Sequence, residues 1–210
     1  VLKNNKGTED NRVRRMDYSI QLSKLFYERF INDEDISLIS PHLAPGLYDA
    51  FGTEDFDDLY EKYENDKTIP KKIVKAQDLF FELLKERAET GRIYIMNIDH
   101  CNSHSSFKDK VSMSNLCQEI TLPTVPIQHI DDDQGEIALC ILSAINVGSL
   151  KDLNELENLC DISVRALDQI IDYQDYPVKA AEVSTKARRS LGIGYILSLI
   201  HISEPTRPIH

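Results

Sequence analysis

The chain contains one stretch in which polar and reactive side chains alternate with others: Met113-Ser114-Asn115-Leu116-Cys117-Gln118-Glu119-Ile120. If this stretch is extended, alternate side chains share a face, so Asn115, Cys117 and Glu119 point the same way. A nearby carboxylate disfavours the thiolate form of a cysteine, so the stretch suits a neutral S–H beside a proton acceptor better than an ionic nucleophile or a metal ligand. Spacing alone favours a plainer interpretation, a strand of mixed polarity at a domain edge.

Composition restricts the class of protein. The 210 residues are 41% apolar, which predicts one or two soluble globular domains. A net charge of -11 argues against DNA, RNA or an anionic membrane surface as a partner. The longest apolar-rich run, 191–202, is shorter than the roughly 18 residues of a membrane helix. We expect no signal peptide, because the sequence does not open with a basic and then an apolar segment. Four cysteines are too few for a disulfide scaffold, so we expect a cytoplasmic location.

Hydrophobic periodicity predicts helices that alternate with short strands. Helices are expected at 11–31, 56–63, 68–89, 152–172 and 179–190. Strands are expected at 36–40, 92–97, 137–142 and 191–196, with polar loops at 41–52 and 99–104. The continuous apolar run at 137–142 is typical of a strand buried on both faces, and Gly91 is expected to end a helix. The pattern favours an α/β fold with a mostly parallel sheet.

Two segments have a composition that a metal site could use. His100-Cys101 with His104 could begin a zinc site, but no second pair of ligands with short spacing follows. The turn Asp131-Asp132-Asp133 lacks the further spaced ligands of a calcium loop. We therefore expect a hydrogen-bonded loop, a solvated turn and no metal.

Four other features have structural explanations that are more common than functional ones. Cys160 lies on the apolar stripe of a helix, as a core residue does. Cys140, in an apolar strand, is most simply a small hydrophobic residue, although it could face a pocket with Cys117. The adjacent Arg188 and Arg189 could meet a phosphate but are typical of a surface, and Gly192-Ile193-Gly194 lacks the third glycine of a dinucleotide loop.

Both ends of the sequence are unusual for a natural protein. The chain begins at Val1 without methionine, and the string after about Ile196 resembles the translated read-through of a sequencing adapter. We expect residues 197–210 to be non-native, and resequencing should replace them.

Several motifs, in order, carry a family resemblance. Ser114-Asn115-Leu116-Cys117-Gln118-Glu119-Ile120 followed by Gly135-Glu136-Ile137-Ala138-Leu139-Cys140 closely resembles the large, catalytic subunit of aerobic class I ribonucleoside-diphosphate reductase. Further matches are the segments 45–51, 91–95, 99–102, 172–177 and 188–194. The resemblance spans about 1–196, but only a minority of the much longer subunit, so the chain is expected to be an internal fragment of its catalytic barrel domain.

The resemblance implies a fold and a set of roles. The fold is part of a ten-stranded α/β barrel in which a central finger loop carries the radical cysteine. Cys117 is implied to form a transient thiyl radical that abstracts the 3′-hydrogen, from a neutral and buried S–H. Glu119 is implied to take the 3′-hydroxyl proton, and Asn115 to hydrogen-bond the sugar hydroxyls. Cys140 is implied to be one of two redox-active cysteines, with its partner upstream of Val1.

The resemblance also implies cofactors and partners. No cofactor is bound by this segment itself: a metal-containing small subunit supplies the radical, and thioredoxin or glutaredoxin supplies electrons. The implied substrates are ribonucleoside diphosphates, and the large subunit is implied to form a homodimer. The enzyme is implied to be allosteric and to serve DNA replication, with ATP or dNTP effectors that bind outside this segment. The 210-residue chain alone is expected to be inactive.

Two other functions fit the residues without the resemblance. One is a hydrolase with Cys117 as nucleophile and a distant histidine such as His129, which rapid labelling by iodoacetamide at neutral pH would favour. The other is a non-enzymatic α/β interaction domain, which the neighbouring DNA would exclude if it encoded the rest of a barrel.

Overall fold

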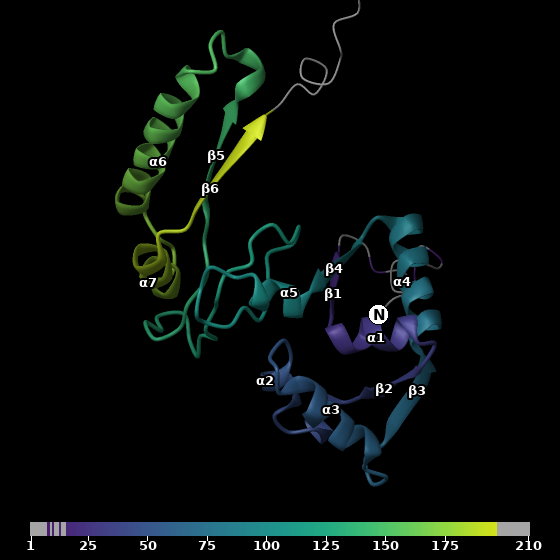
Figure 1. Ribbon diagram of the computed structural model, residues 1–210. Coiled ribbons are helices and arrows are strands. Elements are labelled where there is room, and N and C mark those ends of the chain that lie inside the picture. Colours follow the sequence, from purple (N-terminus) through teal and green to yellow (C-terminus); the bar gives the residue numbers. More distant parts are fainter. Residues whose placement is uncertain (1–7, 9, 11–12, 14–15, 197–210) are drawn as a thin grey trace, which may run out of the picture. The chain divides into compact units, whose positions relative to one another are not determined.

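The computed structural model describes residues 8, 10, 13 and 16–196, so the tail at 197–210 lies outside the described residues. The chain forms two compact units, Val1–Pro123 and Thr124–His210 (Figure 1). None of the described helices has both the length and the apolar composition that a membrane span requires. The reactive stretch 113–120 belongs to the first unit, and Cys140 to the second.

A parallel pair of strands organises the first unit. β1 (Tyr18–Leu22) pairs with β4 (Ile93–Asn97), in register from Tyr18 opposite Ile93 to Leu22 opposite Asn97. The predicted helix at 11–31 is therefore wrong over β1, and among the described residues of this range α1 (Lys24–Ile31) is the helical part. Ser23 starts α1 by accepting a hydrogen bond from the Phe26 amide at 3.3 Å. The apolar spacing of this segment fits a helix locally, but pairing with a strand far along the chain decides its structure.

An antiparallel pair of strands follows α1 in the chain. β2 (Asp35–Ile39) confirms the predicted strand and pairs with β3 (Lys71–Lys75). β3 replaces the first part of the helix predicted at 68–89, and α4 (Ala76–Thr90) is the part that is helical. Ile73 would belong to the apolar stripe of a helix over 68–89, but it is 61% exposed on β3. As predicted, Gly91 ends α4, in the left-handed conformation with φ 67°.

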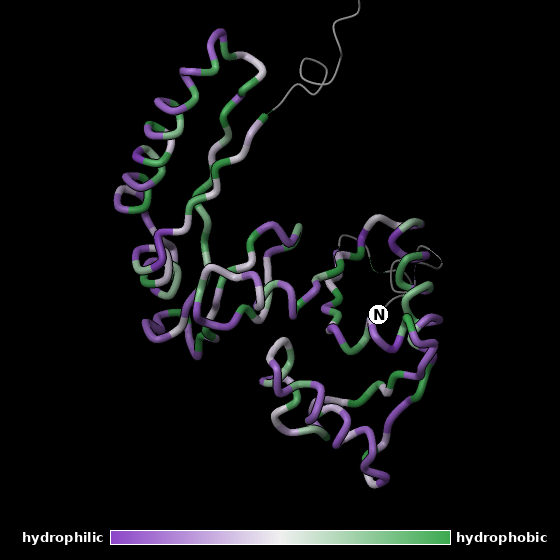
Figure 2. Tube along the Cα trace, viewed as in Figure 1, coloured by the Kyte–Doolittle hydropathy of each residue, from purple (hydrophilic) through white to green (hydrophobic). Residues whose placement is uncertain are grey.

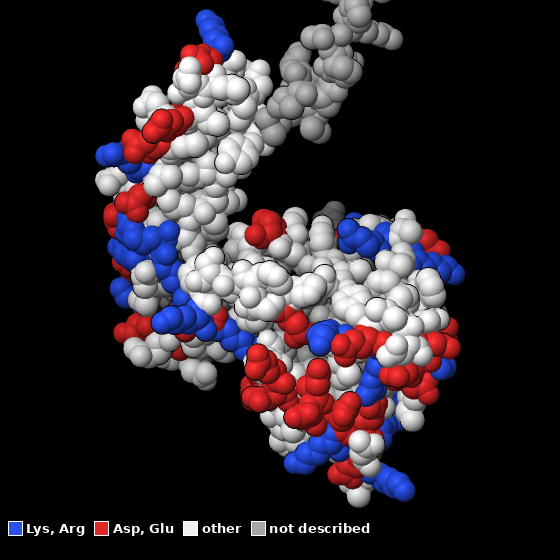
Figure 3. Space-filling model, in the orientation of Figure 1, with Lys and Arg blue, Asp and Glu red and all other residues white. Residues whose placement is uncertain are grey.

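The segment between β2 and β3 is more regular than the predicted loop. It contains η1 (Pro41–Leu43), α2 (Leu47–Ala50) and α3 (Phe56–Asn65), and α3 confirms a predicted helix. Acidic side chains gather over α2 and α3 in Figure 3, as expected of a solvated face. On the inner side Tyr60 is buried, and Arg29 forms two hydrogen bonds with Glu64 at 2.7 and 2.6 Å.

α5 (Ile98–Ser103) directly follows β4. The polar loop predicted at 99–104 is therefore mostly a short helix. Ile98 is fully buried and packs with Met96 and Val111, so one apolar residue fixes the start of α5 although the rest of the segment is polar.

The second unit is a parallel strand–helix–strand arrangement. β5 (Ile141–Asn146) and β6 (Leu191–Ile196) pair in parallel. Between them lie η2 (Val147–Ser149), α6 (Glu155–Tyr173) and α7 (Lys179–Arg188), and α6 shows mixed hydropathy along its turns in Figure 2. The predicted helices at 152–172 and 179–190 and the strand at 191–196 are confirmed within a few residues.

The strand predicted at 137–142 is shifted. β5 begins at Ile141, and Leu142 is 59% exposed, so burial on both faces is not observed among the described residues. Asp152 precedes α6, and its carboxylate accepts from the Asn154 amide at 2.9 Å before the helix begins. An apolar run marks a strand region without fixing its ends.

The described residues contain α/β units with two parallel strand pairs and one antiparallel pair, and they do not form a closed barrel. The α/β prediction is confirmed. The ten-stranded barrel and the finger loop remain predictions.

Candidate functional site

The reactive stretch forms a turn and not a strand. Gln118 adopts φ 66°, a left-handed conformation that is uncommon for a residue with a side chain, and its amide donates to the Asn115 carbonyl at 3.2 Å. The Asn115 side-chain oxygen accepts from the Ile120 amide at 3.0 Å. The extended alternation that would place Asn115, Cys117 and Glu119 on one strand face is therefore wrong, because the Asn115 carboxamide closes the turn on itself.

α5 holds the segment that leads into this turn. Asn102 donates from Nδ2 to the Val111 carbonyl at 3.0 Å, and its Oδ1 accepts from the Val111 amide at 2.8 Å. The same Nδ2 donates to the Ile98 carbonyl at 3.1 Å. Val111 is fully buried, so the turn starts from a fixed point.

Gly52 allows α5 to approach the chain that precedes α3. Its φ is 82°, and a Cβ at this position would lie 2.5 Å from Ile98 Cγ1 and 3.0 Å from Asn102 Nδ2. No side chain fits there without displacing the asparagine that holds Val111. Sequence analysis did not identify Gly52 or Asn102 as functional residues, although the motif at 99–102 contains the asparagine.

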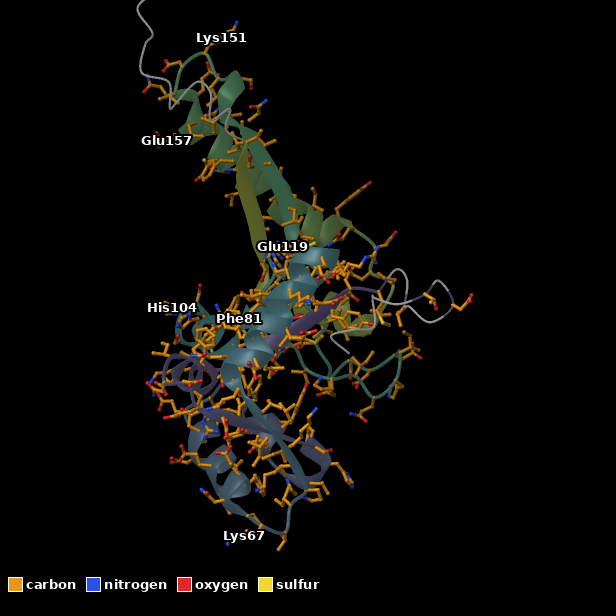
Figure 4. The ribbon with its side chains drawn as sticks, turned by 90° about the vertical axis from the view of Figure 1, so that its right-hand side faces the viewer. Lys67, Phe81, His104, Glu119, Lys151 and Glu157 are labelled. Atoms are coloured by element: carbon orange, nitrogen blue, oxygen red, sulfur yellow. The ribbon has the colours of Figure 1, made fainter. Side chains whose placement is uncertain are left out.

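The three side chains predicted for catalysis differ in exposure. Asn115 is half-buried, whereas Cys117 and Glu119 are exposed. Figure 4 labels Glu119. The buried thiol expected for Cys117 is thus not observed in the described part of this unit. A turn that is anchored at one end and exposes a thiol and a carboxylate can present both groups to a ligand.

Tyr94 on β4 is the side chain that lies beside Cys117. The pKa of the Tyr94 hydroxyl is raised, first by the charge of Cys117 and then by a hydrogen bond between the two side chains. Sequence analysis did not single out Tyr94, whose signal would have been its place on the predicted strand at 92–97. A tyrosine therefore lies beside the cysteine in this unit, whereas a cysteine hydrolase requires a histidine in that position.

The histidines and the cysteine in and directly after α5 have structural contacts. The rings of His100 and His104 lie 5.6 Å apart edge to face, and His104 Nδ1 is 3.2 Å from the His100 carbonyl. Figure 4 labels His104. Cys101 packs on the cluster around Val111, and burial raises its pKa. Within the described ranges, no three His, Cys, Asp or Glu side chains are grouped closely enough to hold a metal.

The acidic turn before Cys140 is organised by its own backbone. Asp132 accepts hydrogen bonds from the amides of Gln128 and Gln134, both at 2.8 Å, and these bonds lower its pKa. Asp132 therefore stabilises the turn from a buried position, so the solvated-turn interpretation is wrong for Asp132 and holds for the exposed Asp131 and Asp133.

Cys140 lies just before β5 and packs against β6. It is half-buried, and a Cβ on Gly192 would lie 3.1 Å from its sulfur. Gly192 therefore leaves the space that the sulfur needs, and it has no role in a dinucleotide loop. Because Cys117 and Cys140 belong to different units, a shared pocket stays a prediction.

The two adjacent arginines of this unit form ion pairs. Arg188 Nε donates to Glu136 at 2.6 Å. Arg189, with φ 47°, binds Asp168 at 2.7 Å and Asp172 at 3.0 Å, and the bond to Asp172 is the first cause of its raised pKa. These contacts connect three motifs that the resemblance identified, at 135–140, 172–177 and 188–194, and they favour a structural role.

Known proteins resemble this chain over nearly its whole length. The family model described as "Ribonucleotide reductase, barrel domain" matches residues 1–197. A ribonucleoside-diphosphate reductase subunit alpha from Haemophilus influenzae is 59% identical over 201 residues, 93% of this chain and 27% of that protein. The Escherichia coli subunit 1 alpha is 55% identical over 93% of this chain and 26% of its own length. The Danio rerio large subunit is 35% identical over 92% and 24%.

The chain spans about a quarter of the length of these curated relatives. The family model covers both units, including the turn with Cys117 and the segment with Cys140. The chain belongs to the ribonucleotide reductase barrel-domain family.

Proposed function

We propose that the protein containing this chain is the catalytic subunit of a ribonucleoside-diphosphate reductase, an oxidoreductase that makes 2′-deoxyribonucleoside diphosphates for DNA synthesis. Membership of the family and up to 59% identity with curated alpha subunits support this activity. The structural observation that supports it best is the anchored turn, where Asn115, Cys117 and Glu119 lie within one backbone reversal.

Cys117 is the proposed radical residue. Its sulfur loses a hydrogen atom to become a thiyl radical, and the radical abstracts the 3′-hydrogen of the ribose, so the S–H bond is re-formed as the C–H bond breaks. A neutral thiol suits this step. The exposure of Cys117 in its unit leaves the sulfur accessible to a substrate.

Glu119 and Asn115 are proposed to act on the sugar hydroxyls. The exposed Glu119 carboxylate takes the 3′-hydroxyl proton as a general base. The Asn115 Oδ1 already accepts from the Ile120 amide, so its Nδ2 is the group available to donate to a hydroxyl. The turn thus combines a base and a donor with the radical cysteine.

Cys140 is the proposed redox-active cysteine. With a second cysteine it supplies two electrons and two protons. One proton leaves with the 2′-hydroxyl as water, the other hydrogen forms the new C2′–H bond, and the two thiols become a disulfide. Its half-buried position against β6 suits a thiol that must stay in one place. Thioredoxin or glutaredoxin is the proposed reductant of that disulfide.

The remaining partners follow from the same proposal. A metal-containing small subunit supplies the radical to Cys117. The large subunit is a homodimer in the cytoplasm, regulated by ATP and dNTP effectors that bind outside residues 1–210. The exposed turn and the acidic surface of this chain do not suggest a nucleic-acid partner.

CDP reduction by the full-length subunit, with its small subunit and thioredoxin, tests this proposal. Cys140→Ser should abolish multiple-turnover dCDP formation, whereas the matched variant Cys160→Ser, on the half-buried side of α6, should retain it. Absence of dCDP with the wild-type protein would refute the activity. Equal turnover by the two variants would remove Cys140 from the redox role.

A further inference from the structure

β1 presents two polar side chains toward the turn that carries Cys117. Ser19 and Gln21 are two residues apart on a strand, so their side chains share one face. Gln21 donates from Nε2 to the Ser112 carbonyl, 91 positions later, at 2.9 Å. This contact fixes Ser112. The preceding residue, Val111, is already held by Asn102.

The second contact reaches the residue that follows Cys117. Gln118 donates from Nε2 to the Ser19 hydroxyl, 99 positions earlier. Gln118 adopts φ 66°, which a glutamine rarely does. Such a conformation persists where surrounding contacts favour it, and here the Asn115 carbonyl and Ser19 hold the two ends of Gln118.

Tyr94 is the residue of β4 that is paired with Ser19. Ser19 is directly opposite Tyr94 in the β1–β4 register, and Gln21 is opposite Met96. Paired residues of parallel strands point to the same side of a sheet, so Ser19 and Tyr94 lie side by side. The charge of Cys117 raises the pKa of Tyr94, which agrees with a sulfur held on this face by Gln118.

We infer that Ser19, Gln21 and Gln118 are positioning residues, which hold the 112–118 turn on the face of β1 so that the Cys117 sulfur stays beside Tyr94. This inference rests on the proposed function for its catalytic consequence. None of the three touches the reacting atoms. Gln21 fixes the start of the turn, and the Gln118–Ser19 bond fixes the residue adjacent to the sulfur.

Removal of one of these bonds should loosen the turn and leave the unit folded. Ser19 is exposed and the bond joins two surface side chains, so its loss exposes no apolar core. A displacement of about 1 Å at a reacting group can reduce a rate on the order of 100-fold. Because the other anchor remains, we expect each single variant to lower kcat roughly tenfold.

The test uses the full-length subunit with its small subunit, thioredoxin and CDP. Ser19→Ala and Gln118→Leu should each lower kcat about tenfold, and the double variant should be no slower than either, because both remove the same bond. Gln21→Glu, which replaces the donor with an oxygen, should act like them. KM for CDP should stay within about twofold, since the substrate contacts remain. Ser19→Thr, which keeps the hydroxyl, should restore kcat.

Thr68→Ala is the matched control. It removes one exposed hydroxyl hydrogen bond in the same unit, from Thr68 Oγ1 to Asp66 at 2.7 Å, remote in sequence from the turn. It should leave kcat unchanged. Amide exchange supplies a readout that needs no turnover: Ser19→Ala and Gln118→Leu should speed exchange of the Gln118 and Ile120 amides, and Thr68→Ala should not.

Wild-type kcat and wild-type exchange in Ser19→Ala and Gln118→Leu would overturn the inference. So would additive losses in the double variant, or a rise in KM with a parallel fall in melting temperature. Cys117→Ser separates the two proposals. If it is inactive while Ser19→Ala is fully active, only the positioning role fails. If Cys117→Ser remains active, the radical role of Cys117 fails, and if the wild-type subunit forms no dCDP, the proposed function fails. In both cases the exchange data still decide whether β1 holds the turn.

Discussion

Substitution of Gly192 by alanine should disturb Cys140, whereas the same change at Gly194 should not. Both glycines lie on β6, two residues apart on one face. A Cβ at Gly192 would lie 2.5 Å from Leu142 Cδ2 and 3.1 Å from the Cys140 sulfur, whereas at Gly194 the nearest atoms are 3.9 Å away. The two variants therefore add the same methyl group to one strand with different neighbours.

The magnitude follows from what can move. Leu142 is 59% exposed, so its terminal methyl can rotate away at little cost. The Cys140 sulfur is half-buried and must shift by a few tenths of an ångström. Overpacking of this kind costs about 1–2 kcal/mol. At Gly194 no clash opposes the lower unfolded-state entropy of alanine, so we expect a gain of about 0.5 kcal/mol.

The assay is chemical denaturation of the full-length subunit, followed through hydrogen exchange of the β5 and β6 amides. CDP turnover is measured on the same samples. Gly192→Ala should lower both the local unfolding free energy and turnover, and Gly194→Ala should lower neither. In a Cys140→Ser background the cost of Gly192→Ala should shrink, because oxygen is smaller than sulfur. Equal effects of the two alanines, or a cost that is independent of Cys140, would refute the reasoning.

Two further predictions concern the first unit. The first is a change in pH dependence. Burial disfavours the Glu64 carboxylate, but the hydrogen bonds from Arg29, Ser37 and Tyr60 and the charge of Arg29 together outweigh it and lower the pKa. The stabilisation by Glu64 is therefore complete above its unfolded-state pKa of about 4.3 and is lost as the pH falls through the lower folded value. Arg29→Met should lower the unfolding free energy by about 3 kcal/mol and raise the Glu64 pKa above its unfolded value, so that stability falls as the pH rises. NMR titration of Glu64 and denaturation at pH 4 and 7 would show this. An unchanged Glu64 pKa would contradict it. The second compares Gly52→Ala with Gly91→Ala. Both positions have positive φ, but only Gly52 faces Ile98 and Asn102, whereas nothing lies within 4 Å of Gly91. In thermal denaturation, Gly52→Ala should therefore destabilise the protein by about 1–2 kcal/mol more than Gly91→Ala. It should also speed exchange of the Val111 amide. Equal destabilisation by the two changes would exclude this explanation.

Elements determined by local interactions could be predicted from the sequence. α3, α6, α7 and the left-handed end of α4 at Gly91 each have apolar spacing or an end residue that acts within a few positions. β4 was predicted because its residues alternate like a strand directly after Gly91, and β6 from its short apolar segment. The helices among these elements owe their form to neighbours in the chain.

β1 and β3 could not be predicted in this way. Each has residues that fit a helix locally, and each becomes a strand through pairing with a distant segment, β4 or β2. The wrong helix at 11–31 concealed the two side chains, Ser19 and Gln21, that contact the reactive turn. Long-range pairing overrides local preference, and a single sequence does not show which strands pair.

The candidate site could be predicted as a set of residues but not as a geometry. The resemblance identified Asn115, Cys117, Glu119 and Cys140, yet the alternation of side chains in 113–120 implied a strand. The Asn115 carboxamide satisfies the Ile120 amide within the turn, so no partner strand is needed. A side chain that bonds its own backbone was the physical effect that periodicity could not reveal.

Replacement of Cys117 by serine in the full-length subunit is the most direct test of the radical mechanism. Serine preserves the shape of the side chain, but its O–H bond is too strong to take the place of the thiol in hydrogen-atom transfer. With the small subunit, thioredoxin and CDP, Cys117→Ser should form no detectable dCDP while its affinity for the nucleotide stays within about twofold of the wild type. Substantial residual dCDP formation by Cys117→Ser would contradict the radical role of this cysteine and, with it, the proposed reductase mechanism.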